Sequence, residues 1–337
     1  MRYRKFGRTA IEISDIAPGL WGMGGWSGSD DKQSLEALQL SVDLGCNFFD
    51  TAWAYGEGKS DGLLGQTIAK NKGKRLYAAS KIPPNNERWP AQPSYEYRDV
   101  FPPDHVFKYA NLIRKQLTTD SIGLRQFHVW TDGWTDEPDF RNTVEKLKRD
   151  GIIRDFGLSL NRWEPENGIK AIRTGLVDAV QVIYSIFDQS PEDELFPACQ
   201  ELNIGVIVRV ALDEGSLGGK MTKDVKFSPA DWRSRYFNPE NLANTMERVD
   251  KLKQILPPGM SLPEMALRFV LSHPEVSTTV VGMRKSQHVR ENTALSDLGA
   301  LSPTLLAELK RHRWDRKPVP RVRLISDSCL GCRSFAD

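Results

Sequence analysis

Four side chains whose types can act together on a carbonyl group stand in or just after short apolar runs. Asp50 and Tyr55 follow the run NFF, Lys81 follows YAAS, and His128 lies within QFHVW. A lysine in such surroundings needs a counter-charge, and Asp50 can supply it. An ammonium group beside a phenol lowers the pKa of that phenol from its usual value of about 10. Tyr55 can then act as a general acid, while a neutral His128 holds a carbonyl oxygen in place.

Other reaction classes lack their characteristic motifs in this sequence. No nucleophile elbow and no HExxH motif are present, and the glycine-rich segment GLWGMGG does not match the GxGxxG of Rossmann folds. Four further polar residues lie at the ends of later apolar runs: Ser159, Asn161, Gln181 and Arg209. The residue types therefore favour chemistry on a carbonyl group, and the elements that carry them must bring their ends together.

Eight short β-rich runs alternate with amphipathic helical stretches. The β-rich runs are 16–22, 47–51, 75–82, 123–130, 153–159, 178–184, 204–212 and 277–283. The predicted helices are 31–45, 60–71, 104–118, 139–151, 164–175, 193–203, 241–256, 262–273, 287–297 and 303–313. Strands that alternate with helices indicate a parallel sheet with right-handed crossovers. Eight such units predict an α/β protein with a closed (β/α)₈ barrel, whose catalytic residues gather at the carboxyl ends of the strands.

The remaining segments extend this barrel into one predicted domain over residues 1–337. Residues 1–15 contain two apolar stretches around a Gly-Arg turn, which predicts a β-hairpin that caps the bottom of the barrel. The connections 83–104 and 213–240 are long, and both follow a strand, so we expect them at the C-terminal face. Residues 314–337 form a C-terminal tail.

The composition narrows the classes of function. The chain has 46 Lys and Arg against 44 Asp and Glu, so its net charge of +2 argues against a nucleic-acid-binding protein. No apolar run is long enough to span a membrane, and the first residues lack the apolar core of a signal peptide. With four cysteines, we expect free thiols in a reducing cytoplasm rather than a disulfide framework. Cys329 and Cys332 form one CxxC without further ligands nearby, so no metal site is predicted.

The segment NFFDTAWAYGEGKSDGLLGQ resembles the signature of the aldo-keto reductase family around its catalytic Asp and Tyr. The later segments AASK, QFHVW, IRDFGLSLN, VQVIYS, GSLGGK and VVGMRKSQHVREN are similar to that family too, in the same order and over nearly the whole chain. The resemblance implies a barrel reductase or dehydrogenase that binds NADP(H) without a Rossmann fold. It implies that Tyr55 is the proton donor, that Lys81 and Asp50 tune it, and that His128 orients the substrate carbonyl.

The resemblance also implies the residues that hold the cofactor. Ser159, Asn161 and Gln181 match positions that hold the nicotinamide carboxamide, although Leu160 separates a Ser-Asn pair that is usually contiguous. The loop after the seventh strand matches the pyrophosphate-binding segment, with Leu212, Gly215, Ser216, Leu217 and Lys220. The segment after the eighth strand matches the adenosine site, with Gly282, Arg284, Gln287, Arg290, Glu291 and Asn292. Arg284 resembles the residue that pairs with the 2′-phosphate of NADP.

The sequence leaves open the substrate, the role of Arg209 and the exact function of the protein. Trp26, Trp53, Trp89 and Trp130 follow predicted strands and suggest an aromatic wall for a carbonyl substrate such as a sugar or sugar derivative. Arg209 replaces an aromatic residue that commonly stacks on nicotinamide, so it either stacks there or reaches the substrate. Two alternatives to a reductase remain, an NADP-binding regulatory subunit and a sugar epimerase that retains its cofactor. The partner is a small carbonyl compound, and the oligomeric state is undetermined.

Overall fold

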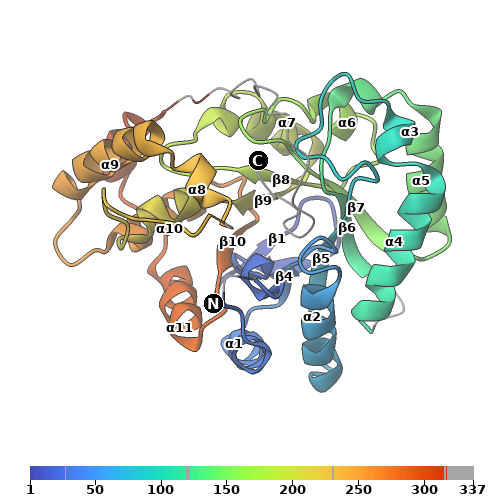
Figure 1. Cartoon of the computed structure of the whole chain (residues 1–337), viewed down its shortest axis with the longest axis horizontal. Helices are drawn as coiled ribbons and strands as arrows, with labels where there is room; N and C mark the ends of the chain where they lie inside the picture. The colour runs from blue at the N-terminus through green and yellow to red at the C-terminus, as the bar shows by residue number, and fades with distance from the viewer. Residues whose placement is uncertain (27, 119–121, 230, 315, 317–337) are drawn as a thin grey trace.

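A closed barrel of eight parallel strands forms the centre of the molecule in the computed structural model (Figure 1). The structure describes residues 1–26, 28–118, 122–229, 231–314 and 316. The barrel strands are β3 (Ile16–Gly19), β4 (Phe48–Asp50), β5 (Tyr77–Ile82), β6 (Ile122–Phe127), β7 (Ile153–Ser159), β8 (Ala179–Ile183), β9 (Gly205–Arg209) and β10 (Thr278–Gly282). Each strand pairs with the next along the chain, and β10 pairs with β3 to close the barrel. This confirms the predicted fold and all eight predicted strands.

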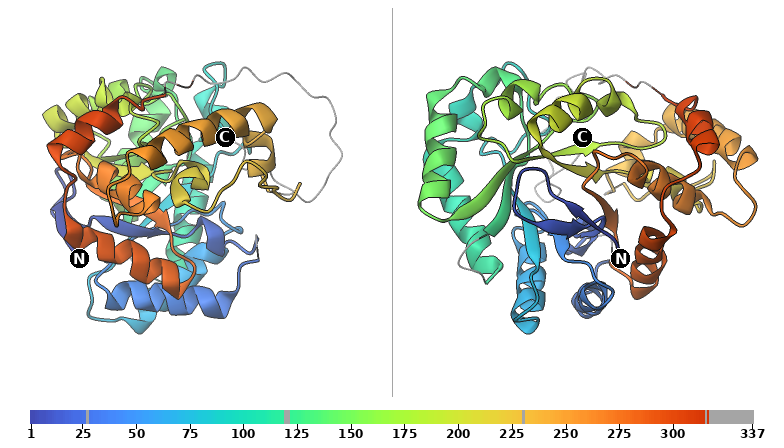
Figure 2. Two further views of the ribbon diagram at one scale, coloured as in Figure 1. Left: turned by 90° about the vertical axis from the view of Figure 1, so that its left-hand side faces the viewer. Right: turned by 180° about the vertical axis from the view of Figure 1, so that it is seen from behind.

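Helices surround the barrel between successive strands, as both views in Figure 2 show. Between the strands lie α1 (Asp31–Asp43), α2 (Lys59–Lys70), α4 (Pro103–Gln116), α5 (Pro138–Arg149), α6 (Ile169–Ile172), α7 (Leu195–Leu202), α9 (Pro239–Gln254) and α10 (Leu262–Leu271). α11 (Ser286–Ala294) and α12 (Pro303–Lys310) follow β10. N-cap side chains explain where two of these helices begin. Asp30 and Ser261 accept hydrogen bonds from backbone N–H groups in the first turns of α1 and α10. No helix in the described ranges is both long and apolar enough to cross a membrane.

The helix predicted over 164–175 is much shorter in the structure. Only α6 is helical there, preceded by turns and by Gly168 as its N-cap. Pro165, Asn167 and Gly168 explain the difference, because proline and glycine destabilise a helix interior and Asn competes for backbone hydrogen bonds. Both long connections contain elements that the sequence did not predict, namely α3 (Tyr97–Val100) in the first and α8 (Arg233–Tyr236) in the second.

The N-terminal hairpin closes one end of the barrel. β1 (Tyr3–Lys5) and β2 (Glu12–Ser14) pair antiparallel, as predicted. Phe6 in the turn packs with Phe48, Leu124 and other barrel-interior side chains, at a ring-centroid distance of 5.4 Å from Phe48. Gly7 has a φ of +53°, and a Cβ there would lie 2.3 Å from the Gly205 nitrogen, so the close approach requires glycine. The hairpin therefore fills the N-terminal end and leaves the carboxyl strand ends as the place for chemistry.

Candidate active site

Lys81 and Asp50 form a buried ion pair at the carboxyl ends of β4 and β5. The Lys81 Nζ donates to Asp50 Oδ1 at 2.7 Å and Oδ2 at 2.8 Å, and to the Thr51 carbonyl at 2.8 Å. Lys81 is 1% exposed. Gln181 Nε2 on β8 donates to the same Asp50 Oδ1 at 2.8 Å. Asp50 and the Thr51 carbonyl together fix the position of the Lys81 head group.

Tyr55 and His128 face this ion pair. The Lys81 Nζ lies 5.1 Å from the centroid of the Tyr55 ring, and the Tyr55 and His128 rings are edge to face at 5.9 Å. Trp89 from the first long connection lies edge to face with His128 at 5.8 Å. The structure therefore brings together Asp50, Tyr55, Lys81 and His128, from three neighbouring strands and the turns that follow them.

Burial and the neighbouring charges set the protonation of these groups. Burial lowers the pKa of Lys81, but Asp50 and Tyr55 outweigh that effect and the pKa is raised above its usual value. Burial, Lys81 and Arg209 hold the pKa of His128 well below its usual value, so the imidazole is neutral at pH 7. Burial raises the pKa of Tyr55, and the opposing charge of Lys81 does not overcome this. The lowered pKa that the sequence predicted for Tyr55 is therefore wrong. That prediction considered the charge of Lys81 but not the burial of the phenol, which disfavours the phenolate.

Of the three residues expected to hold a carboxamide, Gln181 contacts the ion pair directly. Ser159 pairs with Gln181 in the register of β7 and β8. The Gln181 Oε1 atom is buried and has no hydrogen-bond partner among the described residues. Leu160 is 1% exposed and belongs to the hydrophobic core, so the inserted residue leaves Ser159 and Asn161 on the other side of the strand. Asn161 Nδ2 donates to the Ala91 carbonyl at 3.1 Å and to Glu164 at 2.9 Å.

The loop after β9 forms the irregular turn η4 (Asp213–Gly218). Glu214 and Gly215 have φ of +54° and +102°, and a Cβ on Gly215 would meet only the Met221 side chain. Ser216 and Leu217 are buried, and the Ser216 hydroxyl is bound to Asp213 at 2.7 Å. Lys220 is exposed and Leu212 half-buried. Of this set, the loop backbone and Lys220 are the parts that face outward.

The predicted adenosine segment lies after β10 and in the first turns of α11. Gly282 is exposed, and Arg284 is half-buried with its side chain beside Gly22. Gln287 and Glu291 are exposed and joined by a hydrogen bond of 2.7 Å. Arg290 is exposed too, and Asn292 is half-buried. These side chains are accessible to a ligand at this rim of the barrel.

The four tryptophans that the sequence suggested as a substrate wall separate in the structure. Trp130 is 0% exposed among Phe127, Trp134 and Phe140, so it belongs to the core and cannot line a substrate site. Its position directly after β6 gave no sign of this packing. Trp53 packs edge to face on Tyr109 of α4 at 5.4 Å. Trp26 packs near Trp21, whereas the Trp89 ring lies against the His128 ring.

Sequence reasoning missed a group of charged and aromatic residues next to the β9 loop. Arg162 pairs with Glu214 and lies over the rings of Trp163, Trp232 and Tyr236 at 5.0–5.6 Å. Arg316 binds Asp213 at 2.7 Å, Asp188 at 3.3 Å and the Tyr236 hydroxyl at 2.6 Å. These partners come from distant parts of the chain, so no local pattern could reveal them. Cys329 and Cys332 lie outside the described residues.

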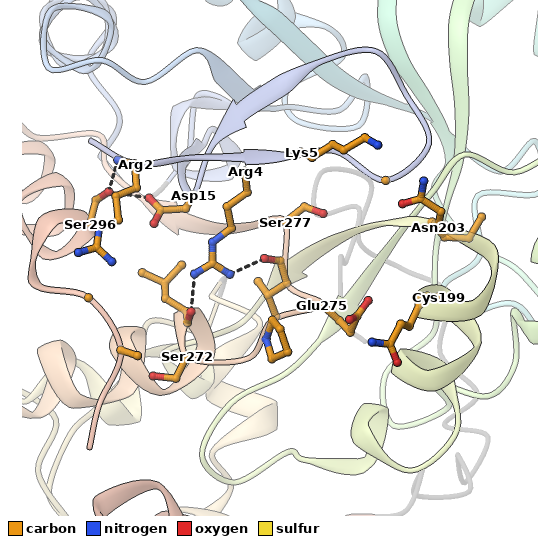
Figure 3. A pocket seen from close by; sticks show the side chains of 18 of the residues that line it. Arg2, Arg4, Lys5, Asp15, Cys199, Asn203, Ser272, Glu275, Ser277 and Ser296 are labelled. Atoms are coloured by element: carbon orange, nitrogen blue, oxygen red, sulfur yellow. Dashed lines mark hydrogen bonds between the residues drawn. The ribbon is translucent and has the colours of Figure 1, made fainter. Parts of the chain in front are cut away.

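A large cavity lies at the other end of the barrel (Figure 3). It has a volume of about 570 Å³ and is lined by the hairpin and by the segments before β9 and β10. Arg4 projects into this region and donates to the carbonyls of His273 at 3.2 Å and Val276 at 2.7 Å, and to that of Leu271. Asp15 accepts a hydrogen bond from Ser296 at 2.7 Å. We call this the floor cavity, and its Arg4 and Asp15 are engaged by the protein itself.

The sequence model described as "Aldo/keto reductase family" matches residues 15–313 of the chain. The protein belongs to this family. Its members are oxidoreductases that act on carbonyl compounds and alcohols, and they use nicotinamide cofactors. The family assignment confirms the resemblance drawn from the strand-end motifs.

Individual relatives are distant in sequence but similar in length. Aldo-keto reductase YhdN of Bacillus subtilis is 28% identical, over 85% of this chain and 86% of its own. The NADH-specific methylglyoxal reductase of Escherichia coli is 25% identical, over 92% of this chain and 98% of its own. The holo form of an aldo-keto reductase from Bacillus halodurans superimposes with a TM-score of 0.74 and 24% identity, covering 94% and 97% of the two chains, which shows the shared fold.

Proposed function

We propose that the protein is an NADP(H)-dependent reductase that converts an aldehyde or ketone, such as a sugar-derived carbonyl compound, to an alcohol. One observation carries the proposal: an acid, its tuning ion pair and a neutral imidazole meet at the carboxyl end of the barrel. The ammonium group is held by Asp50 at 2.7–2.8 Å, and the Tyr55 and His128 rings lie next to it. Such an arrangement suits proton transfer to a carbonyl oxygen.

Each of the four side chains has a distinct role in the proposed carbonyl reduction. The neutral His128 donates a hydrogen bond to the carbonyl oxygen and fixes its orientation, because its lowered pKa keeps it uncharged. As the carbonyl carbon accepts a hydride, negative charge develops on that oxygen. The Tyr55 hydroxyl then gives its proton to the oxygen, and the alcohol forms. Lys81 stabilises the phenolate that remains, and Asp50 holds Lys81 in position.

The residues of this end fit a nicotinamide dinucleotide. The bound cofactor would supply the hydride. The buried Gln181 Oε1 without a partner is the acceptor that a carboxamide NH₂ group requires, and the Ser159 side chain is its neighbour on β7. The half-buried Gly215, where an added Cβ would meet only the Met221 side chain, and the exposed Lys220 suit a pyrophosphate. The half-buried Arg284 favours the 2′-phosphate of NADP(H).

The test is a carbonyl-reduction assay with the purified chain and Tyr55→Phe as the variant. The wild type should oxidise NADPH in the presence of small aldehydes, with kcat/KM for NADPH above that for NADH. Loss of the general acid should lower kcat by about 10²–10⁴-fold. NADPH binding, followed by fluorescence, should stay within a few-fold because the ring is retained. Full turnover by Tyr55→Phe would contradict the proposal.

The same assay distinguishes the two alternative functions. A regulatory subunit would bind NADPH but oxidise it with none of the carbonyl compounds. An epimerase that retains its cofactor would convert its sugar without net NADPH consumption. The arrangement of Asp50, Tyr55, Lys81 and His128 supports the reductase, because a protein that only binds the cofactor needs no proton donor beside an ion pair.

A further inference from the structure

Cationic side chains around the carboxyl ends of the strands differ in their partners. Three of them form ion pairs with carboxylates: Lys81 with Asp50, Arg162 with Glu214, and Arg316 with Asp188 and Asp213. Arg209, at the end of β9, has no carboxylate within ion-pair distance in the part of the chain that the structure describes. The charge of Arg209 is thus not neutralised by a direct partner.

Arg209 also keeps most of its hydrogen-bonding capacity. Its Nη2 donates to the Leu160 carbonyl at 3.0 Å, while its Nε is buried without a partner among the described residues. A guanidinium group has five N–H donors in a planar fork that matches the two oxygens of a carboxylate or phosphate. Burial lowers the pKa of Arg209 to about 10, so the group is still protonated at pH 7. A buried donor without an acceptor destabilises the free protein unless a ligand supplies one.

Arg209 lies within electrostatic reach of the groups that act on the carbonyl. After burial and Lys81, its charge contributes to the lowered pKa of His128, and at Tyr55 it opposes the rise in pKa that burial causes. The comparison with Arg125 on β6 is instructive, since the Arg125 guanidinium nitrogens also lack partners. Arg125 is 0% exposed and therefore sealed from any ligand, whereas Arg209 is only half-buried. Of these two, only Arg209 is open to a bound molecule.

We propose that Arg209 recognises an anionic group on the substrate, so that the preferred substrates are aldehydes or ketones that carry a carboxylate or a phosphate. The inference rests on the proposed function and adds the substrate class. The guanidinium group holds the anion while the carbonyl points to Tyr55 and His128, and the anionic group is unchanged by the reaction. Stacking on the nicotinamide is the alternative, but it would place a cation against a ring that is itself cationic when oxidised.

Matched pairs of substrates test this assignment. Succinate semialdehyde is compared with butanal, and glyceraldehyde 3-phosphate with glyceraldehyde, by NADPH oxidation with the wild type and with Arg209→Met and Arg209→Lys. The measured quantity is the ratio of kcat/KM within each pair, which is independent of the overall rate. We expect a ratio of at least ten for one pair or both in the wild type. Arg209→Met should bring that ratio to within about twofold of one, and Arg209→Lys should keep part of it.

Each other outcome has a definite meaning. Ratios near one for both pairs in the wild type would overturn the inference while leaving the reductase proposal intact. A ratio that is unchanged in Arg209→Met, with weaker NADPH binding, would overturn it in favour of stacking on the cofactor. If Arg209→Met does not fold, inhibition of wild-type butanal reduction by succinate but not by succinamide carries the test, and equal inhibition would overturn the inference. Failure of all four compounds to oxidise NADPH would instead contradict the proposed function.

Discussion

Buried polar groups at the two ends of the barrel differ in whether the protein supplies their hydrogen-bond partners. At the floor cavity, Arg4 donates to three backbone carbonyls and Asp15 accepts from Ser296. At the carboxyl end, Gln181 Oε1, His128 Nδ1 and Arg209 Nε are buried without partners among the described residues. The floor cavity is large, about 570 Å³, yet its buried Asp15 and the inward-pointing Arg4 are hydrogen-bonded by the protein. Buried polar atoms without partners also occur elsewhere, as at Arg125, so it is their grouping around the Lys81–Asp50 ion pair, rather than cavity volume, that points to the candidate active site.

The Lys81–Asp50 ion pair should show the largest effect at the carboxyl end. Lys81→Met leaves the Asp50 carboxylate buried without a cation, so the free energy of unfolding should fall by about 3–5 kcal/mol. The kcat for carbonyl reduction should fall by about a thousandfold, because Tyr55 loses the ammonium beside it. Urea unfolding and NADPH oxidation measure the two effects.

A double variant separates stability from catalysis at this end. Asp50→Asn combined with Lys81→Met removes both charges, so it should recover much of the lost stability and none of the activity. Recovery of activity in the double variant would show that the ion pair only supports the fold.

Substitutions at the floor cavity should change the free energy of unfolding but not the catalytic activity. Arg4→Met removes the donors to the His273, Val276 and Leu271 carbonyls, and the free energy of unfolding should fall by about 2–4 kcal/mol. The exposed Lys5→Met, next in the chain, is the matched control and should change it by less than about 0.5 kcal/mol. Both variants should keep kcat/KM within about twofold. A loss of activity in Arg4→Met without a loss of stability would make the floor cavity functional.

The smallest expected effect is that of pH on kcat/KM, which should not fall on the acid side of neutrality. The pKa of His128 is held well below its usual 6.5, so the imidazole stays neutral as the pH falls to 6. The pKa of Tyr55 is raised above 10, so the phenol keeps its proton as the pH rises to 9. The kcat/KM for carbonyl reduction should therefore be flat from about pH 6 to pH 9, measured at constant ionic strength. A limb with a pKa between 6 and 7 would show that His128 titrates.

The sequence predicted the fold, and it predicted that Asp50, Tyr55, Lys81 and His128 lie together, because both depend on local patterns. Alternation of strands and helices implies a barrel, and the barrel places strand-end residues such as Asp50 and Lys81 together. The sequence did not predict features that depend on packing between distant parts of the chain. Trp130 follows a strand as a ligand-facing residue would, but the rings of Phe127, Trp134 and, from α5, Phe140 enclose it. Arg162 and Glu214 are 52 residues apart, and only the folded chain shows that they pair.

Arg316 links the last described part of the polypeptide to the catalytic face. It reaches back 103 residues to Asp213 and 128 residues to Asp188. A chain shortened before residue 316 would hold these two carboxylates near each other with no guanidinium between them, and proton uptake by Asp188, whose pKa is already about 6, would become easier. Removal of the chain from residue 316 onward would therefore change the electrostatics beside the β9 loop, at the carboxyl end of the barrel.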